Sequence, residues 1–332
     1  MKKTIVISIG DFNGIGPEVI LKAIGPVLNN DTQYIVLGHD SILSYYADLL
    51  ELNVKINPIT SPSQAKSELL NVINVTKEEP ILAPGNLTKE AGDLSMKAIQ
   101  QGIELCLERS ADALVTAPIS KEAIQLAGYN YPGHTEFLAE KTGCSDYMMI
   151  LVSGDIRVGL VTGHIPVSKI SEYLTAESIS EKIRTMNHSL KTDFGITFPR
   201  IAVFGLNPHA GDGGVLGSEE ETIIRPAIDV MKSEGILAEG PFPADGFFGN
   251  KKQESYDGIV AMYHDQGLVP FKALSFGGGV NFTAGLPIIR TSPDHGTAYG
   301  IAGKGLAEPG SFTEAISLAE KLISVKVKRG EM

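Results

Sequence analysis

Short apolar segments alternate along this chain with longer segments whose apolar residues recur at helical spacing. Residues 3–9 form an apolar run that predicts a strand, and a helical pattern follows with Pro17 and Glu18 in its first turn. Proline is favoured at the first helical position, and an acidic side chain is favourable near a helix N-terminus. The same order returns at residues 34–46 and 113–124. This alternation predicts βαβ units around a mostly parallel sheet, and therefore an α/β fold.

The pattern changes near Tyr147. The apolar runs 148–152 and 156–161 flank a short turn segment that contains Gly154. Two strand-like runs joined in this way are typical of a β-hairpin. Antiparallel strands at this point indicate a second lobe.

Three histidines each stand where a strand-like run breaks into a loop, next to Gly, Pro, Asn or Asp. They are His164, His209 and His264. In open α/β sheets, ligands bind beyond the carboxyl ends of the strands, so side chains that follow three different strands can converge. Neutral imidazoles suit a divalent transition metal and leave coordination positions open for a substrate. The pattern predicts one metal site, although each histidine taken singly could also serve only in a turn.

The composition is that of an ordinary enzyme, with 332 residues of which 43% are hydrophobic and 20% charged. The formal net charge of -11 argues against a nucleic-acid partner, because phosphate neutralisation needs clustered Lys and Arg. The two cysteines, Cys106 and Cys144, are too few for a disulfide framework. The apolar run near the N-terminus is shorter than a signal-peptide core, and no segment is long and apolar enough to cross a bilayer. We therefore expect a cytoplasmic protein that binds neither nucleic acid nor a membrane.

The glycine-rich loop of residues 10–18 follows the first predicted strand and opens a helix. Its backbone N–H groups could therefore meet an anion. Its glycines fit neither the dinucleotide-binding nor the P-loop pattern. A tight strand-to-helix turn, in which glycine supplies positive φ, explains the loop equally well. The sequence leaves both interpretations open.

A lysine, an asparagine and an arginine follow the third histidine within one glycine-rich stretch, as Lys272, Asn281 and Arg290. Such groups suit a phosphate, because Arg offers a planar donor fork, Lys a compact charge, and backbone amides between glycines complete a cradle. His134 and Thr135 stand in another polar loop before a helix and could donate to the same anion. Together with the metal, these residues describe a site for a small phosphorylated substrate whose hydroxyl or amine chelates the ion.

Five motifs spread over the chain are shared with one family. They are GIGPE at residues 14–18, TAPISK at 116–121, PGHTEFLA at 132–139, NPHAGDGG at 207–214 and YHDQG at 263–267. On these motifs the chain resembles the 4-hydroxythreonine-4-phosphate dehydrogenases of pyridoxal phosphate biosynthesis, from the first strand to the last helix. One departure is Asp11-Phe12-Asn13-Gly14, where the family usually has Asp-Pro-Ala-Gly. The loop shape is expected to differ there, and the proposed ligands are unaffected.

The resemblance implies an isocitrate/isopropylmalate-dehydrogenase-like fold, with two α/β/α lobes, an active-site cleft between them, and an obligate homodimer. We place the first lobe at residues 1–120 plus 286–332. The second lobe, at residues 121–285, would carry the metal and the dimer contacts. The dimer rests on the resemblance alone, because no interface can be identified from composition or periodicity.

The resemblance also implies roles for individual residues. It implies metal ligation by His164, His209 and His264, and substrate binding by His134, Thr135, Lys272, Asn281 and Arg290. The metal site would be shared across the dimer. Zinc is the expected ion, with magnesium or cobalt as alternatives.

A second local match concerns the cofactor. Residues 294–307 are similar to the adenosine-binding loop of the metal-dependent β-decarboxylating dehydrogenases, which binds NAD without a Rossmann fingerprint. The resemblance therefore implies cofactor contacts by His295, Gly296, Gly303 and Leu306. The sequence does not distinguish NAD from NADP.

The implied reaction is oxidation of the C3 hydroxyl of 4-phosphooxy-L-threonine by NAD, followed by decarboxylation to 3-amino-2-oxopropyl phosphate. A bound metal acts as a Lewis acid in both steps. The general base is left open among Asp245, Asp265 and Lys272. A paralogous dehydrogenase of 4-phospho-D-threonate or D-erythronate is the alternative. A metal-dependent phosphatase or aldolase would lack the nucleotide loop, and a binding protein without catalysis would tolerate loss of the metal.

Overall fold

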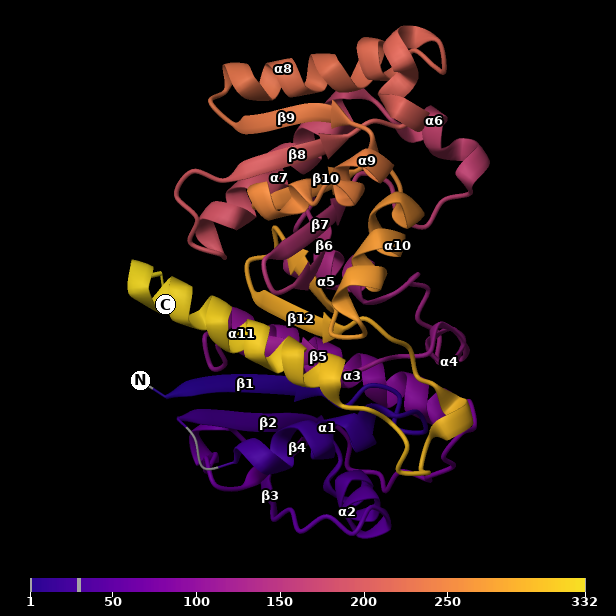
Figure 1. Cartoon of the computed structure of the whole chain (residues 1–332). Helices are drawn as coiled ribbons and strands as arrows, with labels where there is room; N and C mark the ends of the chain where they lie inside the picture. Colours follow the sequence, from indigo (N-terminus) through magenta and orange to yellow (C-terminus); the bar gives the residue numbers. More distant parts are fainter. Residues whose placement is uncertain (1, 29–30, 332) are drawn as a thin grey trace. The chain divides into compact units, whose positions relative to one another are not determined.

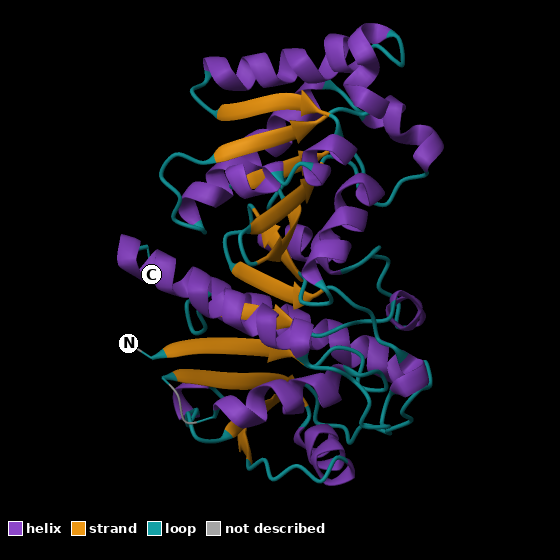
Figure 2. Ribbon diagram, viewed as in Figure 1, coloured by secondary structure: helices purple, strands orange, loops and turns teal. Residues whose placement is uncertain are grey.

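The structure is a computed structural model that describes residues 2–28 and 31–331 (Figure 1). The chain divides into two compact units. Unit 1 is formed by Met1–Ser145 and Leu286–Met332, and unit 2 by Asp146–Gly285. Helices and strands alternate in both units (Figure 2), so the α/β class predicted from the sequence is confirmed.

The strands of unit 1 lie in the order β3-β4-β2-β1-β5-β12, and each neighbouring pair in that order is parallel. Their bounds are β1 (Lys3–Ser8), β2 (Thr32–Gly38), β3 (Ile56–Ile59), β4 (Leu70–Asn74), β5 (Ala113–Thr116) and β12 (Ile289–Pro293). Parallel strands are covered on both faces and are therefore continuously apolar. In β1 the side chains of Ile5, Val6 and Ile7 are all fully buried.

The helices of unit 1 cover this sheet. They are α1 (Gly16–Ile24), α2 (Asp40–Leu49), α3 (Lys89–Leu107), α4 (Lys121–Leu126), α5 (His134–Thr142) and α11 (Gly310–Arg329), with the short turns η1 (Gly25–Val27), η2 (Pro62–Gln64) and η7 (Tyr299–Ile301). Helices α3 and α11 both contact β1 and β5, and Figure 1 shows α11 in yellow in front of β5.

Unit 2 has a mixed sheet in the order β11-β6-β7-β10-β8-β9. The bounds are β6 (Met148–Ser153), β7 (Ile156–Leu160), β8 (Arg200–Phe204), β9 (Leu237–Phe242), β10 (Gly258–Ala261) and β11 (Val280–Ala284). Strand β6 pairs antiparallel with β11 and β7, while β7, β10, β8 and β9 are parallel neighbours. The hairpin predicted around Gly154 is therefore confirmed, and Gly154 has the positive φ of 56° that a tight turn requires.

The helices of unit 2 include a long one, α7, that contacts β6, β7, β8, β10 and β11. The bounds are α6 (Ile170–Tyr173), α7 (Ala176–Thr192), α8 (Arg225–Ser233), α9 (Ala244–Gly249) and α10 (His264–Ser275), with the turns η3 (Val167–Lys169), η4 (Pro208–Gly214), η5 (Glu220–Ile224) and η6 (Lys252–Ser255). Among residues 2–28 and 31–331, no helix combines the length and apolarity needed to span a bilayer.

The first boundary between the units differs from the boundary expected from the sequence. It falls after Ser145, whereas the expected first lobe ended at residue 120. The reason is packing, because Phe137 and Leu138 of α5 are buried in the core around α3. The segment of α4 and α5 therefore belongs to unit 1. The second boundary lies between residues 285 and 286.

Candidate active site

All three predicted metal-ligand histidines follow strands of unit 2 and lie beyond the carboxyl ends of those strands. Strand β10 lies between β7 and β8 and runs parallel to both, so the carboxyl ends of the three strands open on the same side. His164 follows β7, His264 opens α10 after β10, and His209 lies in the turn η4 after β8. The segment that carries His264 therefore lies between the other two segments.

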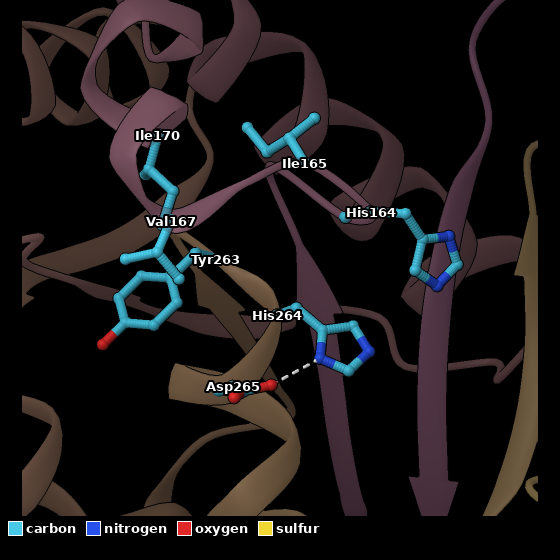
Figure 3. Close-up of a pocket in the computed structure, with 8 residues that line it drawn as sticks. His164, Ile165, Val167, Ile170, Tyr263, His264 and Asp265 are labelled. Atoms are coloured by element: carbon cyan, nitrogen blue, oxygen red, sulfur yellow. Dashed lines mark hydrogen bonds and ion pairs between the residues drawn. The ribbon is translucent and has the colours of Figure 1, made fainter.

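His164 and His264 lie next to each other in a pocket of about 220 Å³ (Figure 3). Their ring centroids are 5.7 Å apart. Tyr263 and Asp265 line the same pocket, and Asp265 Oδ1 lies 2.7 Å from His264 Nδ1. A carboxylate on one ring nitrogen orients an imidazole and directs its other nitrogen to a metal. His264 is thus held as a ligand would be held.

His209 lines a second pocket, of about 510 Å³. Asp245 from α9 also lines this pocket, together with Tyr263 and Asp265. Because Tyr263 and Asp265 line both pockets, the two pockets adjoin at the N-terminus of α10. Asp245 and Asp265, two of the three candidate bases, therefore flank the region between His209 and His264.

The donor chemistry suits a divalent transition metal, because imidazole nitrogens are its common ligands. Within the described residues, however, no three His, Cys, Asp or Glu side chains are close enough together to hold an ion. The chain thus brings His164 and His264 side by side and holds His209 in the adjoining pocket.

Arg290 is the most deeply buried of the candidate substrate ligands. It lies on β12 in unit 1 with 1% of its surface exposed. Its Nε and Nη2 donate to Thr116 Oγ1 at 3.2 and 2.6 Å. Burial lowers the pKa of Arg290 to about 9, and the charge of Glu136 opposes that shift. A guanidinium already desolvated and oriented by a hydroxyl is preorganised to bind an anion.

His134 opens α5 and lies close enough to Arg290 for the two to influence each other electrostatically. Burial, and then the charge of Arg290, lowers the pKa of His134 well below its usual range. Its Nε2 is buried and has no hydrogen-bond partner among the described residues. A buried polar atom normally has a partner, so this nitrogen is suited to a ligand group. Thr135, the next residue, is partly buried.

The two remaining substrate candidates belong to unit 2. Lys272 is exposed on α10, the helix that His264 opens. Asn281 lies on β11, and its Oδ1 is buried without a partner in the part of the chain that the structure describes. The predicted substrate residues are thus divided, with Arg290, His134 and Thr135 in unit 1.

The glycine-rich loop after β1 is a structural turn. The N–H groups of Asn13 and Gly14 donate to Asp11, and that of Ile15 donates to the carbonyl of Thr297 at 2.9 Å. The Asp11 N–H donates to the carbonyl of Pro118. These four N–H groups are therefore not available to an anion. For these groups, the anion-binding interpretation of the loop at residues 10–18 is wrong.

The departure from the family pattern in this loop is accommodated by specific contacts. The Phe12 side chain is fully buried, and its carbonyl accepts a hydrogen bond from Tyr46 Oη at 2.9 Å. The Asn13 side chain accepts from Ala83 N–H at 2.8 Å and donates to Thr88 Oγ1 at 3.1 Å. Phe12 and Asn13 together fix the loop against neighbouring segments of unit 1.

The predicted cofactor residues lie in a loop of unit 1 that folds over the start of α1. His295 Nδ1 lies 3.2 Å from the carbonyl of Gly296, and Gly303 has a φ of 72°. Leu306 is 62% exposed, so a large apolar side chain is presented to a ligand or to solvent. Such an exposed apolar side chain can lie against the face of a nucleotide base.

Two residues that hold this loop were missed from the sequence. Glu18 is fully buried and accepts from Ala307 N–H at 2.8 Å. Lys22 donates to Glu18 and to the carbonyls of Gly305 and Ala307, each at 2.8 Å. Their spacing of four residues signals a helical ion pair, but nothing in the sequence signals the contact with the distant loop.

Comparisons with known proteins agree over nearly the whole chain. The family described as pyridoxal phosphate biosynthetic protein PdxA matches residues 30–319. A 4-hydroxythreonine-4-phosphate dehydrogenase of Prosthecochloris aestuarii is 47% identical, with 96% of each chain covered. One from Bacteroides thetaiotaomicron is also 47% identical, covering 96% of this chain and 88% of the relative.

Solved structures agree as well. The crystal structure of 4-hydroxythreonine-4-phosphate dehydrogenase from Klebsiella pneumoniae has a TM-score of 0.87 and 39% identity. The match covers 97% of this chain and 99% of that one. The fold, the full-length coverage and the sequence identity point the same way, and the chain belongs to the PdxA family of pyridoxal phosphate biosynthetic proteins.

Proposed function

We propose that this chain is an NAD-dependent oxidoreductase that oxidises 4-phosphooxy-L-threonine at C3 and then decarboxylates it to 3-amino-2-oxopropyl phosphate. Relatives that are 47% identical to this chain are named 4-hydroxythreonine-4-phosphate dehydrogenases, which supports this proposal. The observation that carries the proposal is the set of three histidines beyond the adjacent strands β7, β10 and β8. The product would serve pyridoxine 5'-phosphate biosynthesis.

The metal is proposed to be held by His164, His209 and His264. A divalent ion bound there, zinc or alternatively magnesium or cobalt, supplies Lewis acidity to the substrate oxygen. His264 is oriented for this role by Asp265 at 2.7 Å. We propose that a homodimer shares the site, so that donors come from two copies of the chain.

The substrate phosphate is proposed to bind Arg290 and His134, with Thr135, Lys272 and Asn281 as further substrate contacts. Arg290 contributes a buried charge, and His134 contributes a buried nitrogen that needs a partner. The negative phosphate would offset the cost of burying the guanidinium.

The reaction needs a group that takes the proton of the C3 hydroxyl as hydride leaves to the nicotinamide. Asp245, Asp265 and Lys272 remain the candidates. Asp245 and Asp265 both line the His209 pocket. Asp265 already holds His264, so its carboxylate is partly committed to orienting that ring.

The nicotinamide cofactor is proposed to contact His295, Gly296, Gly303 and Leu306. The support is the hydrogen bond from the N–H of Ala307 to Glu18, which ties this loop to α1. NAD is the expected form, with NADP as the alternative. Protein groups fix the geometry, while the cofactor accepts the hydride.

The experiment that tests the ligand role compares His209→Ala with His188→Ala. His188 is exposed on α7 of the same unit and serves as the control. His209→Ala should lose bound metal and nearly all turnover with an unchanged circular dichroism spectrum, while His188→Ala should keep both. Full metal content and activity in His209→Ala would remove this residue from the ligand set.

A further inference from the structure

Glu220 is a buried carboxylate beside the loop that carries His209. Its surface is 1% exposed. Oε1 accepts from the N–H groups of Leu206 and Asn207, both at 2.7 Å. Oε2 accepts from Asn207 Nδ2 at 3.0 Å, and that amide also donates to Glu219. Glu220 thus binds two backbone N–H groups and one side-chain amide just before His209.

The His209 loop has a backbone that needs such support. Every residue from 209 to 214 has a positive φ. Three of these residues, His209, Ala210 and Asp212, are not glycine. Side chains with a Cβ are disfavoured in this region, and such conformations persist only where the surroundings hold them. Glu220 accepts hydrogen bonds from the backbone N–H groups of Leu206 and Asn207, which lead directly into this strained segment.

Two glycines make room for the carboxylate. A Cβ on Gly211 would lie 2.6 Å from Glu220 Oε2, and one on Gly205 would lie 3.0 Å from Oε1. Glu220 therefore occupies the interior of the turn between β8 and His209. A buried carboxylate is stable only with enough donors, and here the donors come from the segment that leads to His209.

We propose that Glu220 is a positioning residue that holds the backbone of the His209 loop in the conformation required for metal binding. The inference rests on the proposed role of His209 as a ligand. It predicts that Glu220 acts on metal affinity without touching the metal. Groups that orient the ligands of a metal typically change its affinity by about 10–100-fold when they are removed.

The test is a titration of the apo protein with Co²⁺, followed by visible absorption, with hydrogen–deuterium exchange of the loop as a readout independent of metal. Glu220→Ala should weaken Co²⁺ binding by about 10–100-fold and speed amide exchange across residues 205–217. Glu220→Gln should be affected less, because its carbonyl oxygen can still accept both backbone N–H groups. Glu221→Ala is the control, since Glu221 is exposed and pairs with Arg225; both readouts should stay at wild-type values.

A glycine pair tests the same contact from the other side. Gly211 and Gly213 have φ values of 81° and 65°, so alanine is strained at both. An alanine Cβ at Gly211 would strike Glu220, whereas one at Gly213 would meet nothing within 4 Å in residues 2–28 and 31–331. Gly211→Ala should therefore weaken Co²⁺ binding at least tenfold more than Gly213→Ala does.

The outcomes separate this inference from the proposed function. If His209→Ala binds Co²⁺ as tightly as the wild type, the ligand role of His209 is wrong, and the positioning role fails with it. If His209→Ala loses Co²⁺ while Glu220→Ala keeps wild-type affinity and exchange, only the role of Glu220 is overturned. If Glu220→Ala does not fold, the glycine pair decides, and a Gly211→Ala variant that binds Co²⁺ as tightly as Gly213→Ala overturns the proposal.

Discussion

Arg290 carries a charge in the interior of unit 1. The free-energy cost of burying that charge follows from the shift of its pKa. Burial lowers its pKa from the ordinary value of a guanidinium to about 9. One pKa unit corresponds to about 1.4 kcal/mol, so the charged form is disfavoured by on the order of 5 kcal/mol. Below pH 9 both the folded and the unfolded chain carry the proton. The full cost therefore applies at pH 7. It is lost only as the pH rises above about 9, where the folded chain releases the proton before the unfolded chain does.

Replacing Arg290 with methionine, which is apolar and of similar length, should remove this cost. The hydrogen bonds to Thr116 are lost as well, so we expect a net gain of about 1–4 kcal/mol in the free energy of unfolding, as for other buried charges replaced by apolar side chains. The phosphate should lose two charge-assisted hydrogen bonds of about 1.5 kcal/mol each, which raises the substrate KM roughly 150-fold. Urea unfolding and steady-state kinetics measure the two effects.

Arg157 in unit 2 offers a matched control, because it is also buried, and its guanidinium contacts backbone carbonyls and an aromatic ring. Its Nη1 donates to the carbonyls of Asp155 and Asp257 at 3.0 and 3.2 Å, and its guanidinium lies 4.6 Å from the ring centroid of Phe194. Arg157→Met should therefore destabilise the protein by about 2–3 kcal/mol and leave KM unchanged. An Arg290→Met variant that is destabilised like Arg157→Met, with unchanged KM, would refute the argument and make Arg290 a structural residue.

Two further predictions concern unit 1. Burial raises the pKa of Asp11, and the hydrogen bond that Tyr299 donates to Asp11 at 2.7 Å partly opposes this shift. Tyr299→Phe removes that hydrogen bond and should therefore raise the pKa of Asp11 further. A raised carboxyl pKa reduces stability as the pH rises through the shifted range, so the loss, about 1 kcal/mol, should be larger at pH 7 than at pH 4 in urea unfolding. Gly92→Ala should lower the free energy of unfolding by about 2 kcal/mol or more, because the added Cβ would collide with the Ala123 backbone. Gly246→Ala is the control, since a Cβ there has more room, and equal stability of the two variants would contradict the prediction.

The hydrophobic pattern predicted the strands and turns that depend on residues close together in the sequence. The strand-then-helix order predicted at residues 113–124 is present as β5 followed by α4, and the hairpin predicted around Gly154 is present as β6 and β7. The alternation of elements also identified three strands whose carboxyl ends meet, although nothing in the sequence showed that β10 lies between β7 and β8. Strand order depends on long-range packing, which has no local sequence pattern.

The residues that hold the loops of the site, Glu18 and Glu220, could not be predicted either, because their contacts also depend on long-range packing. Glu18 has the spacing of an ordinary helical ion pair with Lys22, yet its oxygen accepts from the N–H of Ala307, far along the chain. Glu220 stands in an acidic stretch that suggests a solvated surface, yet it is buried against Asn207. The first glycine-rich loop kept two interpretations open until the partners of its N–H groups were known.

The central claim is most directly tested by NADH formation from purified protein and NAD with 4-phosphooxy-L-threonine, and separately with 4-phospho-D-threonate. Each substrate is assayed before chelation, after chelation and after metal restoration. We expect NADH from the L-threonine derivative only, and we expect it to be lost on chelation and recovered with the metal. NADH from the D-threonate alone, or NADH from the L-threonine derivative that persists in the fully metal-free protein, would contradict it.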